Sequence, residues 1–384
     1  MSFISKLKYA PIKDLLELMK SENRPKGCLS YDLVTELKPI DLYCYFYAKY
    51  GPPNGLQNML RNNSSDNLIH WEWTFFIGNS VVTFQSHSVR TELHFIGELS
   101  NPPDIGVVVS EIKDDFKSYG KGIKKVRLKL EKWTRYVNPF NRLQVVVKQT
   151  IKNIGQLNID IESDRSKMTL TTPSGVGSEG LVEGLLSRYN NAVCYYFSLK
   201  SMLPVMAESF VNLVIFILAR KEIKDNDRHF QNVIRQQIDI RVQSLHLNCV
   251  GFKGVIDYSN EKCKRFHSII NERNDILHGN MDLKNLRIGD IYFNGNVPIF
   301  TEYDDLYSRT SGVYLNSIKY DSIISDYDDI INFINYIMDH LEPREKVCIE
   351  QLAFRREIGV NSKDGRLGAL LPDHMADFRT VKNA

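Results

Sequence analysis

The first part of the chain takes its architecture from the stretch HWEWTFFIGNSVVTFQS, residues 70–86. Aromatic and β-branched residues, which favour pleated strands, fill both halves of this stretch. Gly78 and Asn79 separate the two halves, and this pair is typical of a tight β-hairpin turn. Residues 89–98 have a similar composition. We therefore expect three consecutive strands at 70–77, 81–86 and 89–98.

On the C-terminal side of this hairpin, more strands are expected up to about residue 175. Residues 126–136 alternate apolar and charged side chains, which predicts a half-exposed strand. A turn at 138–141 leads into the next run, and the further strands expected are 142–151, 157–161 and 168–172. Helical patterns are expected at 4–19, 39–50 and 109–119. Consecutive strands at this spacing predict an antiparallel sheet, with a sandwich as one form of it, flanked by a few helices.

After residue 180 the hydrophobic periodicity changes to that of helices. Helices are expected at 181–200, 204–221, 228–247, 260–278 and 326–341. Pro204 is expected in the first turn of its helix, where a missing N–H does no harm. Four to five helices with short connections predict an all-α bundle, interrupted by an insertion at 286–321 that contains a hairpin at 291–300.

The predicted fold class is therefore α+β, with an N-terminal antiparallel β-sheet domain and flanking helices, followed by a C-terminal helical bundle. We place the N-terminal domain, for sensing or RNA binding, at 1–175. The bundle occupies 176–345, and a C-terminal tail follows at 346–384, loosely ordered from residue 360 onward. A chain of 384 residues is long enough for two domains with a large core.

The composition is that of a soluble globular protein, with 43% hydrophobic and 25% charged residues. The net charge of +3 creates no global basic field, so any nucleic-acid site must be local. None of the six cysteines forms a Cys-x-x-Cys pair or has a histidine at repeated zinc-ligand spacing, so we expect reduced thiols and no metal. The N-terminus lacks a secretory signal pattern, and the most apolar stretch, 210–219, is too short to span a bilayer. We expect a cytoplasmic protein without membrane contact and a buried core helix at 210–219.

A glycine-rich stretch at 175–180 matches the pattern Gly-x-Gly-x-x-Gly of dinucleotide-binding loops. The surroundings do not fit such a loop, because the preceding strands are predicted to be antiparallel. Position 200, where a ribose-binding acid would be expected, is a lysine. A flexible linker between domains explains the glycines better.

A basic region extends from Lys113 to Arg142, with ten lysines and arginines and interleaved aromatic residues. Cations that bind phosphates and aromatic rings that stack on bases together make a nucleic-acid surface. The residues singled out for RNA contact are Lys124, Lys125, Arg127, Lys129, Lys132, Trp133 and Arg135. The alternative interpretation is an ordinary solvated strand face and helix edge.

The stretch Arg273-Asn274-Asp275-Ile276-Leu277-His278-Gly279 ends a predicted helix and is the main candidate site. A guanidinium stays charged, whereas an imidazole exchanges a proton near neutral pH. The first group can hold a phosphate while the second moves protons, which suits cleavage of a phosphodiester. The same spacing recurs at Arg241–His246, so spacing alone is weak evidence. There the arginine is followed by an apolar valine, and we interpret that copy as packing or surface.

Three acidic residues could act on this motif. Glu208 and Asn212 lie four apart on the helix that contains Pro204, and Glu208 could orient Arg273 or His278 if the two helices pack together. The alternative is a surface acid beside the bundle core. Glu272 and Asp275 flank the motif and could tune the imidazole, although most such acids face water.

Arg273, Asn274 and His278, in the order Arg-Asn-x-x-x-His-Gly near the end of a late helix, resemble the motif of the HEPN (higher eukaryotes and prokaryotes nucleotide-binding) superfamily. The resemblance covers residues 180–342. It implies two bundles that dimerise and bring two Arg–His pairs into one cleft, without metal or cofactor. His278 would serve as general acid or base, Arg273 would stabilise the phosphorane, and Asn274 would position an oxygen. The implied products are a 2′,3′-cyclic phosphate and a 5′-hydroxyl.

The order of the domains is similar to that of HEPN proteins of bacterial defence, including the abortive-infection type, in which a sensing domain precedes the nuclease. That similarity implies a toxin or antiphage role in the cytoplasm, with RNA such as tRNA as substrate. It also implies an antitoxin or regulatory partner beside the homodimer. Some members of the superfamily bind nucleotides or partners without cleaving RNA. A non-catalytic regulatory protein is therefore the alternative function.

Overall fold

The computed structural model describes residues 2–22, 24–33, 36–55, 68–97, 103–170, 179–280, 287, 289–301 and 307–371. The described chain is mixed α+β and divides into two compact units. The sheet unit holds residues 1–136 and 357–384, and the helical unit holds residues 137–356. This division falls before the expected boundary near residue 175, because the chain from 139 onward is already helical and packs with the later helices.

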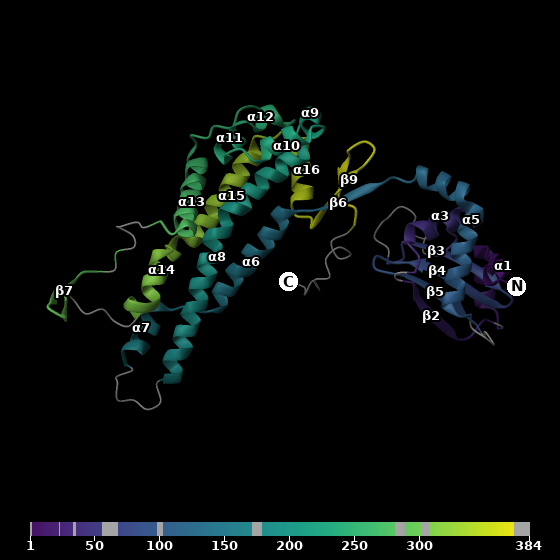
Figure 1. Ribbon diagram of the computed structural model, residues 1–384, viewed down its shortest axis with the longest axis horizontal. Coiled ribbons are helices and arrows are strands. Elements are labelled where there is room, and N and C mark those ends of the chain that lie inside the picture. Colours follow the sequence, from purple (N-terminus) through teal and green to yellow (C-terminus); the bar gives the residue numbers. More distant parts are fainter. Residues whose placement is uncertain are drawn as a thin grey trace. The chain divides into compact units, whose positions relative to one another are not determined.

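The sheet unit contains a five-stranded antiparallel sheet of order β1-β3-β4-β5-β2 (Figure 1). Its strands are β1 (Lys8–Tyr9), β2 (Cys28–Leu33), β3 (Trp71–Ile77), β4 (Ser80–Ser86) and β5 (Thr91–Ile96). Gly78 at φ +60° forms the turn between β3 and β4, where Ile77 pairs with Ser80. The predicted hairpin and the strand after it are confirmed, while β2 was not predicted.

One face of this sheet packs against two helices, α3 (Pro39–Tyr50) and α5 (Ile105–Lys129). Phe46 of α3 lies against Trp73, Phe75 and Phe84, with ring centroids 5.6, 5.7 and 4.8 Å away. Aromatic side chains on alternate strand positions therefore build the core that the sequence predicted. The core of the five-stranded sheet is thus closed by helices and not by a second sheet, so the sandwich form of the prediction is wrong.

Several strands predicted before residue 175 are helices in the structure. The region 126–136 is divided between the last turns of α5 and a short strand, β6 (Trp133–Val137). Leu128 is 77% exposed, so the alternation there is that of a helix end solvated on most sides. The regions 142–151 and 157–170 belong mainly to α6 (Pro139–Gln156) and α7 (Ile161–Leu170), and the last two residues of the strand expected at 168–172 lie outside the described part. The Asn138 side chain caps α6 by accepting a bond from the Asn141 backbone N–H.

The N-terminal helix expected at 4–19 is also different in the structure. It is replaced by α1 (Phe3–Lys6), strand β1 and α2 (Ile12–Lys20). Ala10 and Pro11 separate β1 from α2, and the Ala10 backbone N–H donates to the Thr74 carbonyl at the edge of the sheet. Pairing with β3 therefore takes this segment away from the helical path that its composition favours.

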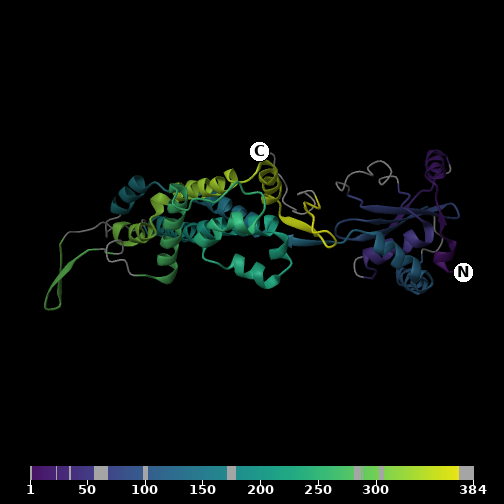
Figure 2. The ribbon, with the colours of Figure 1, turned by 90° about the horizontal axis from the view of Figure 1, so that it is seen from above.

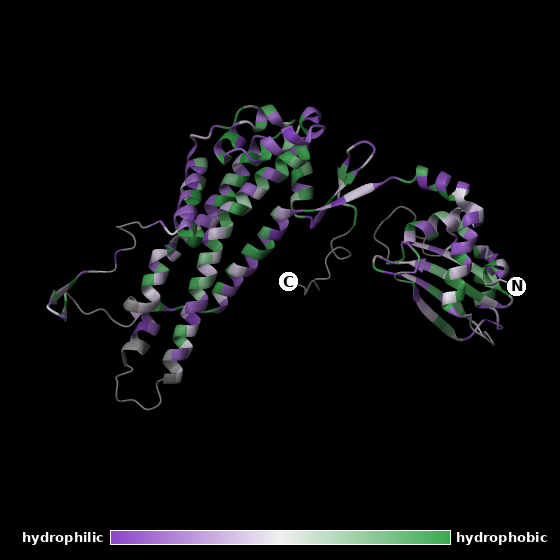
Figure 3. Cartoon of the chain, in the orientation of Figure 1, coloured by the Kyte–Doolittle hydropathy of each residue, from purple (hydrophilic) through white to green (hydrophobic). Residues whose placement is uncertain are grey.

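The central element of the helical unit is α8 (Glu179–Leu218). Packed around it are α6, α13 (Glu261–His278), α15 (Ile323–Asp339) and α16 (Pro343–Ala353), and α6 and α15 lie alongside it in both views (Figures 1 and 2). Hydrophobic residues are concentrated in its C-terminal half, where Met206, Val211 and Val214 are fully buried (Figure 3). The expected break before Pro204 is wrong, because packing on several sides supports a helix that continues through the proline.

The rest of the unit contains shorter elements. Residues 228–247, expected as one helix, form parts of three helices. These are α10 (Asp227–Ile234), α11 (Ile238–Gln243) and α12 (Leu245–Asn248), preceded by α9 (Lys221–Lys224). The predicted insertion contains the expected hairpin, with strands β7 (Ile291–Asn294) and β8 (Val297–Phe300) joined through Gly295 at φ +61°. Its later part is helical, in η1 (Ser308–Gly312), α14 (Val313–Ser317) and η2 (Tyr320–Ser322).

The chain after residue 345 is more ordered than expected. Helix α16 is followed by β9 (Glu357–Asn361) and β10 (Leu367–Gly368), which form a three-stranded sheet with β6 in the order β10-β9-β6. The loosely ordered tail expected from residue 360 is therefore wrong as far as β10, and residues 372–384 lie outside the described part. Pairing of β9 with a strand more than two hundred positions earlier gives no periodic signal within either segment.

One described helix, residues 183–218 of α8, is long and apolar enough to cross a membrane by length and composition. Within its apolar window, 61% of the residues are buried inside the helical unit. This burial fits the core helix predicted at 210–219, because a helix enclosed by other helices is apolar on most sides.

Candidate active site

Helix α13 begins and ends where the sequence predicted. The Asn260 side chain accepts a bond from the Lys262 backbone N–H at 3.0 Å and caps the first turn. Phe266 stacks on Phe333 of α15, with ring centroids 3.9 Å apart. Gly279 adopts the left-handed conformation, with φ +64°, and its N–H donates to the Asp275 carbonyl. The helix therefore ends on His278.

Arg273 is held by an acid from the central helix. Its Nη2 donates to Glu208 Oε1 at 3.0 Å, and the two side chains are 20% and 27% exposed. The Arg273 Nε is buried and has no hydrogen-bond partner in the described part of the chain. The structure thus brings together Arg273 and Glu208, the pair that the sequence suggested. One edge of the guanidinium is anchored, and the pair remains reachable from solvent.

The second Arg-x4-His copy contacts the same helix one turn later. Arg241 Nη1 donates to Asn212 Oδ1 at 2.8 Å, and its Nη2 donates to the Gln236 carbonyl at 2.7 Å. Arg241 is only 7% exposed. Burial lowers the pKa of Arg241, and the charge of Glu208 opposes that shift. Both acceptors that contact Arg241 are neutral, so Glu208 is the carboxylate whose charge acts on this guanidinium as well as on Arg273.

His278 is exposed in the last turn of α13. Its ring makes no hydrogen bond within the described residues, while Asn274 is half-buried on the same helix. Arg273 and His278 are five positions apart, which corresponds to about 140° around a helix and about 7.5 Å along it. The arginine therefore turns toward α8, and the imidazole is free to meet a molecule from solvent.

The two acids beside the motif bind other groups. Glu272 lies 3.2 Å from Lys200 Nζ and 3.4 Å from Lys319 Nζ. Asp275 accepts a bond from Asn280 Nδ2 at 2.8 Å, just past the end of the helix. Neither acid contacts the imidazole of His278. Their contacts therefore do not support a role in shifting its proton affinity.

Lys200 of α8 is the centre of a buried polar network beside the motif. The side chain is 1% exposed, pairs with Asp326 of α15 and donates to Ser322 Oγ at 2.7 Å. A buried ammonium is tolerated only when acceptors surround it, and Glu272 supplies another. The network ties α8, α13 and α15 together and fixes the direction of the last turns of α13.

The predicted RNA-contact residues lie on α5, β6 and the connection between them. Most of them are exposed, but several are engaged: Arg127 pairs with Asp41, and Arg135 lies 3.4 Å from Glu357. The Trp133 ring carries the guanidinium of Arg366 at 5.5 Å from its centroid. Among the predicted contact residues, the exposed lysines that make no ion pair within the described chain are Lys124, Lys125, Lys129 and Lys132. The basic region is thus helical as far as Lys129, continues into the short strand β6, and is partly neutralised.

The glycine-rich stretch at 175–180 lies mostly outside the described residues. Its last two described positions, Glu179 and Gly180, begin α8. The described strands of the five-stranded sheet pair antiparallel throughout, so they do not form the parallel βαβ unit that a dinucleotide loop requires.

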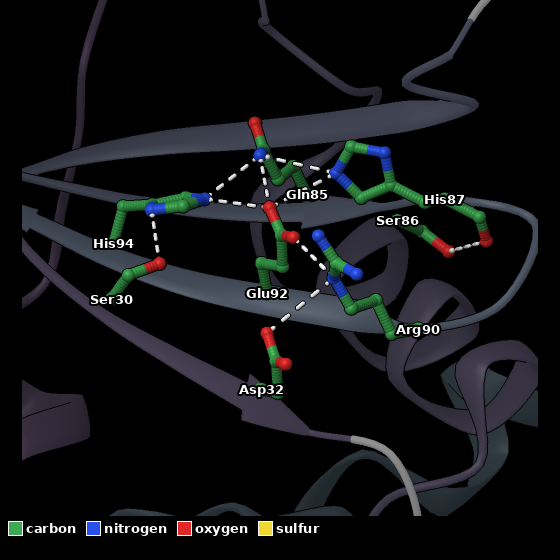
Figure 4. A network of polar contacts seen from close by, with 8 residues as sticks. All are labelled: Ser30, Asp32, Gln85, Ser86, His87, Arg90, Glu92 and His94. Atoms are coloured by element: carbon green, nitrogen blue, oxygen red, sulfur yellow. Dashed lines mark hydrogen bonds and ion pairs between the residues drawn. The ribbon is translucent and has the colours of Figure 1, made fainter.

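A polar network on the sheet unit was missed by sequence analysis (Figure 4). Glu92 Oε2 lies 3.0 Å from His87 Nε2, 2.9 Å from His94 Nε2 and 2.6 Å from Gln85 Nε2. Burial disfavours ionisation of Glu92, but hydrogen bonds from Gln85, Arg90 and His94 outweigh it and lower its pKa to about 2. The sequence signal for this network was the placement of Glu92 and His94 two residues apart, on one face of β5. Gln85 of β4 lies directly opposite Glu92. The donors and acceptors satisfy one another, which favours a structural role.

Comparisons with known proteins identify no relative of this chain. No family model, no curated protein and no solved structure matches the chain. Among the described residues, no group of three or more His, Cys, Asp or Glu side chains could hold a metal ion. The residues around α13 are therefore the main indication of function within the described chain.

Proposed function

We propose that the chain is a metal-independent endoribonuclease of the HEPN type. The observation that supports this most is the environment of α13, in which Arg273 is anchored by Glu208 while His278 stands exposed at the capped helix end. A fixed cation beside a solvent-accessible imidazole suits phosphodiester cleavage.

In the proposed reaction, His278 takes the proton of the ribose 2′-hydroxyl, and the 2′-oxygen forms a bond to the adjacent phosphorus. The bond from phosphorus to the 5′-oxygen breaks, and an imidazolium returns a proton to that oxygen. Arg273 stabilises the charge on the phosphorane oxygens, and Asn274 positions one of them. The products are a 2′,3′-cyclic phosphate and a 5′-hydroxyl.

A homodimer through the helical unit is part of this proposal. On one helix the two side chains point about 140° apart, so a phosphate is better served by groups from two copies of α13. The exposed lysines of α5 and its connection, including Lys124 and Lys132, would add contacts to the RNA backbone. A cytoplasmic toxin or antiphage enzyme, restrained by an antitoxin or regulatory partner, is the cellular role that fits such an activity.

The test is incubation of the purified full chain with total RNA, including tRNA, in excess EDTA. We expect cleavage that survives the chelator and leaves ends that can be extended only after removal of a cyclic phosphate. Cleavage that requires added Mg²⁺, or products with 3′-hydroxyl ends, would contradict the mechanism.

The alternative is a non-catalytic nucleotide- or partner-binding regulatory protein. One observation favours it: Arg273 is already paired with Glu208 in the single chain, so its charge is partly neutralised. Under this alternative, calorimetry would detect stoichiometric nucleotide binding that Arg273→Ala abolishes, while RNA remains intact under all conditions.

A further inference from the structure

A pocket of about 690 Å³ opens in the helical unit between α6, α8, α15 and α16. None of its lining residues belongs to α13, so it is distinct from the site around Arg273. Its volume falls in the range of sites for small organic molecules, about 300–1,000 Å³. The proposed function does not use this pocket.

The interior of the pocket is apolar and includes aromatic rings. Phe140 and Phe210 meet edge to face, with centroids 5.2 Å apart, and Ile334, Met338 and Ile349 complete much of the wall. Phe354, which is exposed, lies at its edge. Such a lining favours a ligand with a flat or ring-shaped hydrocarbon body, because aromatic faces and edges pack well against rings.

The residues that line the pocket carry one net negative charge, with Asp339 and Glu350 against Lys346. Lys346 Nζ lies 2.9 Å from Asp339 Oδ1, so these two charges compensate each other. Glu350, one turn after Lys346 on α16, is exposed and makes no ion pair or hydrogen bond within the described chain. The amides of Gln144 and Asn335 add neutral donors and acceptors. Lys262 and His340 also lie near Asp339, so Glu350 is the carboxylate of the lining that is left open to a cation from solvent.

The walls are held in place by hydrogen bonds that do not depend on a ligand. Asn138 Nδ2 donates to the carbonyls of Leu352 and Ala353 at 3.1 and 3.0 Å, and Asn141 Nδ2 donates to the Phe354 carbonyl at 2.8 Å. These bonds join the start of α6 to the end of α16. A preformed pocket loses little conformational entropy when it is filled.

We propose that this pocket binds a small amphipathic molecule with an aromatic body and a cationic head group, and that Glu350 receives the cation. The body lies against Phe140 and Phe210, and the amides at Gln144 and Asn335 orient it. The site is independent of RNA cleavage and adds a small-molecule ligand to the helical unit.

The test uses the full chain and two fluorescent probes: 9-aminoacridine, an aromatic cation, and anilinonaphthalene sulfonate, an aromatic anion. We expect one saturable site per chain for the cation and binding of the anion that is at least about tenfold weaker. Glu350→Gln should weaken binding of the cation by about fivefold. Glu345→Gln, on the same helix but outside the pocket lining, should leave it unchanged.

A pocket-filling variant, Met338→Trp, should abolish binding of 9-aminoacridine, with circular dichroism as the check that the helices are retained. If Met338→Trp does not fold, the comparison of Glu350→Gln with Glu345→Gln decides alone. Equal binding of both probes, or binding that none of the folded variants changes, would overturn the proposal. Absence of saturable binding of the cation would overturn it as well.

Discussion

Two Arg-x4-His segments lie in the same helical unit and differ in nearly everything except their spacing. Arg273 and Arg241 both contact α8, through Glu208 and Asn212, which are one turn apart. Arg273 has a charged partner and is partly open to solvent, whereas Arg241 is buried among neutral acceptors. The same side chain therefore supports an anion site in one place and the packing of the fold in the other.

The two histidines differ in the same direction. His278 is exposed at a helix end that Gly279 closes, and its ring has no partner among the described residues. His246 is half-buried, and its Nδ1 lies 2.8 Å from the Gln243 carbonyl. This contact occupies Nδ1 and leaves only Nε2 of the half-buried His246 ring for proton transfer. Spacing selects candidates, and the surroundings of each side chain separate a reactive pair from a structural one.

The largest expected effect concerns the network that orients α13. Lys200→Met removes the buried cation that pairs with Asp326 and leaves it only the partly exposed Arg265, whose Nη2 lies 3.8 Å away, among the described ion pairs. It should lower the free energy of unfolding by about 3–5 kcal/mol, measured by urea denaturation. Lys221→Met is the matched control, since its pair with Asp225 is exposed and should contribute less than about 1 kcal/mol. The double change Lys200→Met with Asp326→Leu should recover much of the loss. Equal stability of the Lys200 and Lys221 variants would contradict this view of the network.

The next effect separates the two arginines by activity. Arg273→Ala should reduce RNA cleavage by about 10²- to 10³-fold, because it removes the donor to the phosphorane. Arg241→Ala should instead lower stability by about 1–3 kcal/mol, because buried acceptors lose their donor, while the folded fraction still cleaves RNA. Single-turnover cleavage and thermal unfolding of both variants provide the measurement. Loss of cleavage in folded Arg241→Ala, with activity retained in Arg273→Ala, would reverse the assignment.

A third effect concerns Glu92 of the sheet unit, which contacts the imidazoles of His87 and His94, whereas the imidazole of His278 is exposed. The folded pKa of Glu92, about 2, lies below its usual value of about 4.3. Its stabilising contribution is therefore present above about pH 4.3 and is lost as the pH falls toward 2. Glu92→Gln should destabilise the protein by about 1.5–3 kcal/mol at pH 7 and by much less near pH 2.5, with no change in cleavage. If the loss of unfolding free energy caused by Glu92→Gln were the same at pH 7 and pH 2.5, a lowered pKa of Glu92 would be ruled out. Glu17→Gln on α2, where the side chain is exposed, is the control.

The smallest expected effect lies at the helix end that presents His278. An added Cβ at Gly279 meets no atom within 4 Å, so Gly279→Ala tests backbone strain alone. We expect a loss of about 1–2 kcal/mol in the free energy of unfolding, together with faster amide exchange in the last turn. Gly184→Ala in α8, also in open space, should instead stabilise the protein by about 0.5–1 kcal/mol. Destabilisation by both variants would show that strain at Gly279 is not the cause.

Some of the fold followed directly from local patterns. The β3–β4 hairpin, α3 and α13 were predicted with nearly correct ends, because Gly78, the proline at the start of α3, Asn260 and Gly279 carry turn and cap signals in the sequence. The candidate contact between Glu208 and Arg273 was also predictable, since both lie on helix faces expected to meet in a bundle. Residue types at element ends are thus reliable guides where they specify local geometry.

Other parts depended on tertiary contacts that no local pattern contains. The sequence at the end of α5 has the pattern of a strand, because Leu128 and Leu130 alternate with charged residues. In the structure both leucines are exposed, so this alternation does not mark a buried face. Helix α8 continues through Pro204 because neighbouring helices support it, and β9 finds its partner β6 far away in the chain. The network around Glu92 required the register of β4 against β5. In each case the sequence showed the chemistry of the side chains but not which residues they contact.

The most direct test replaces each of the two histidines by alanine and compares the variants under the same conditions. His278→Ala and His246→Ala are compared in single-turnover cleavage of RNA in EDTA, with dimer formation checked by light scattering. The account predicts that His278→Ala slows cleavage by about 10²- to 10⁴-fold while His246→Ala cleaves at the rate of the unaltered chain. Undiminished cleavage by folded, dimeric His278→Ala would contradict it.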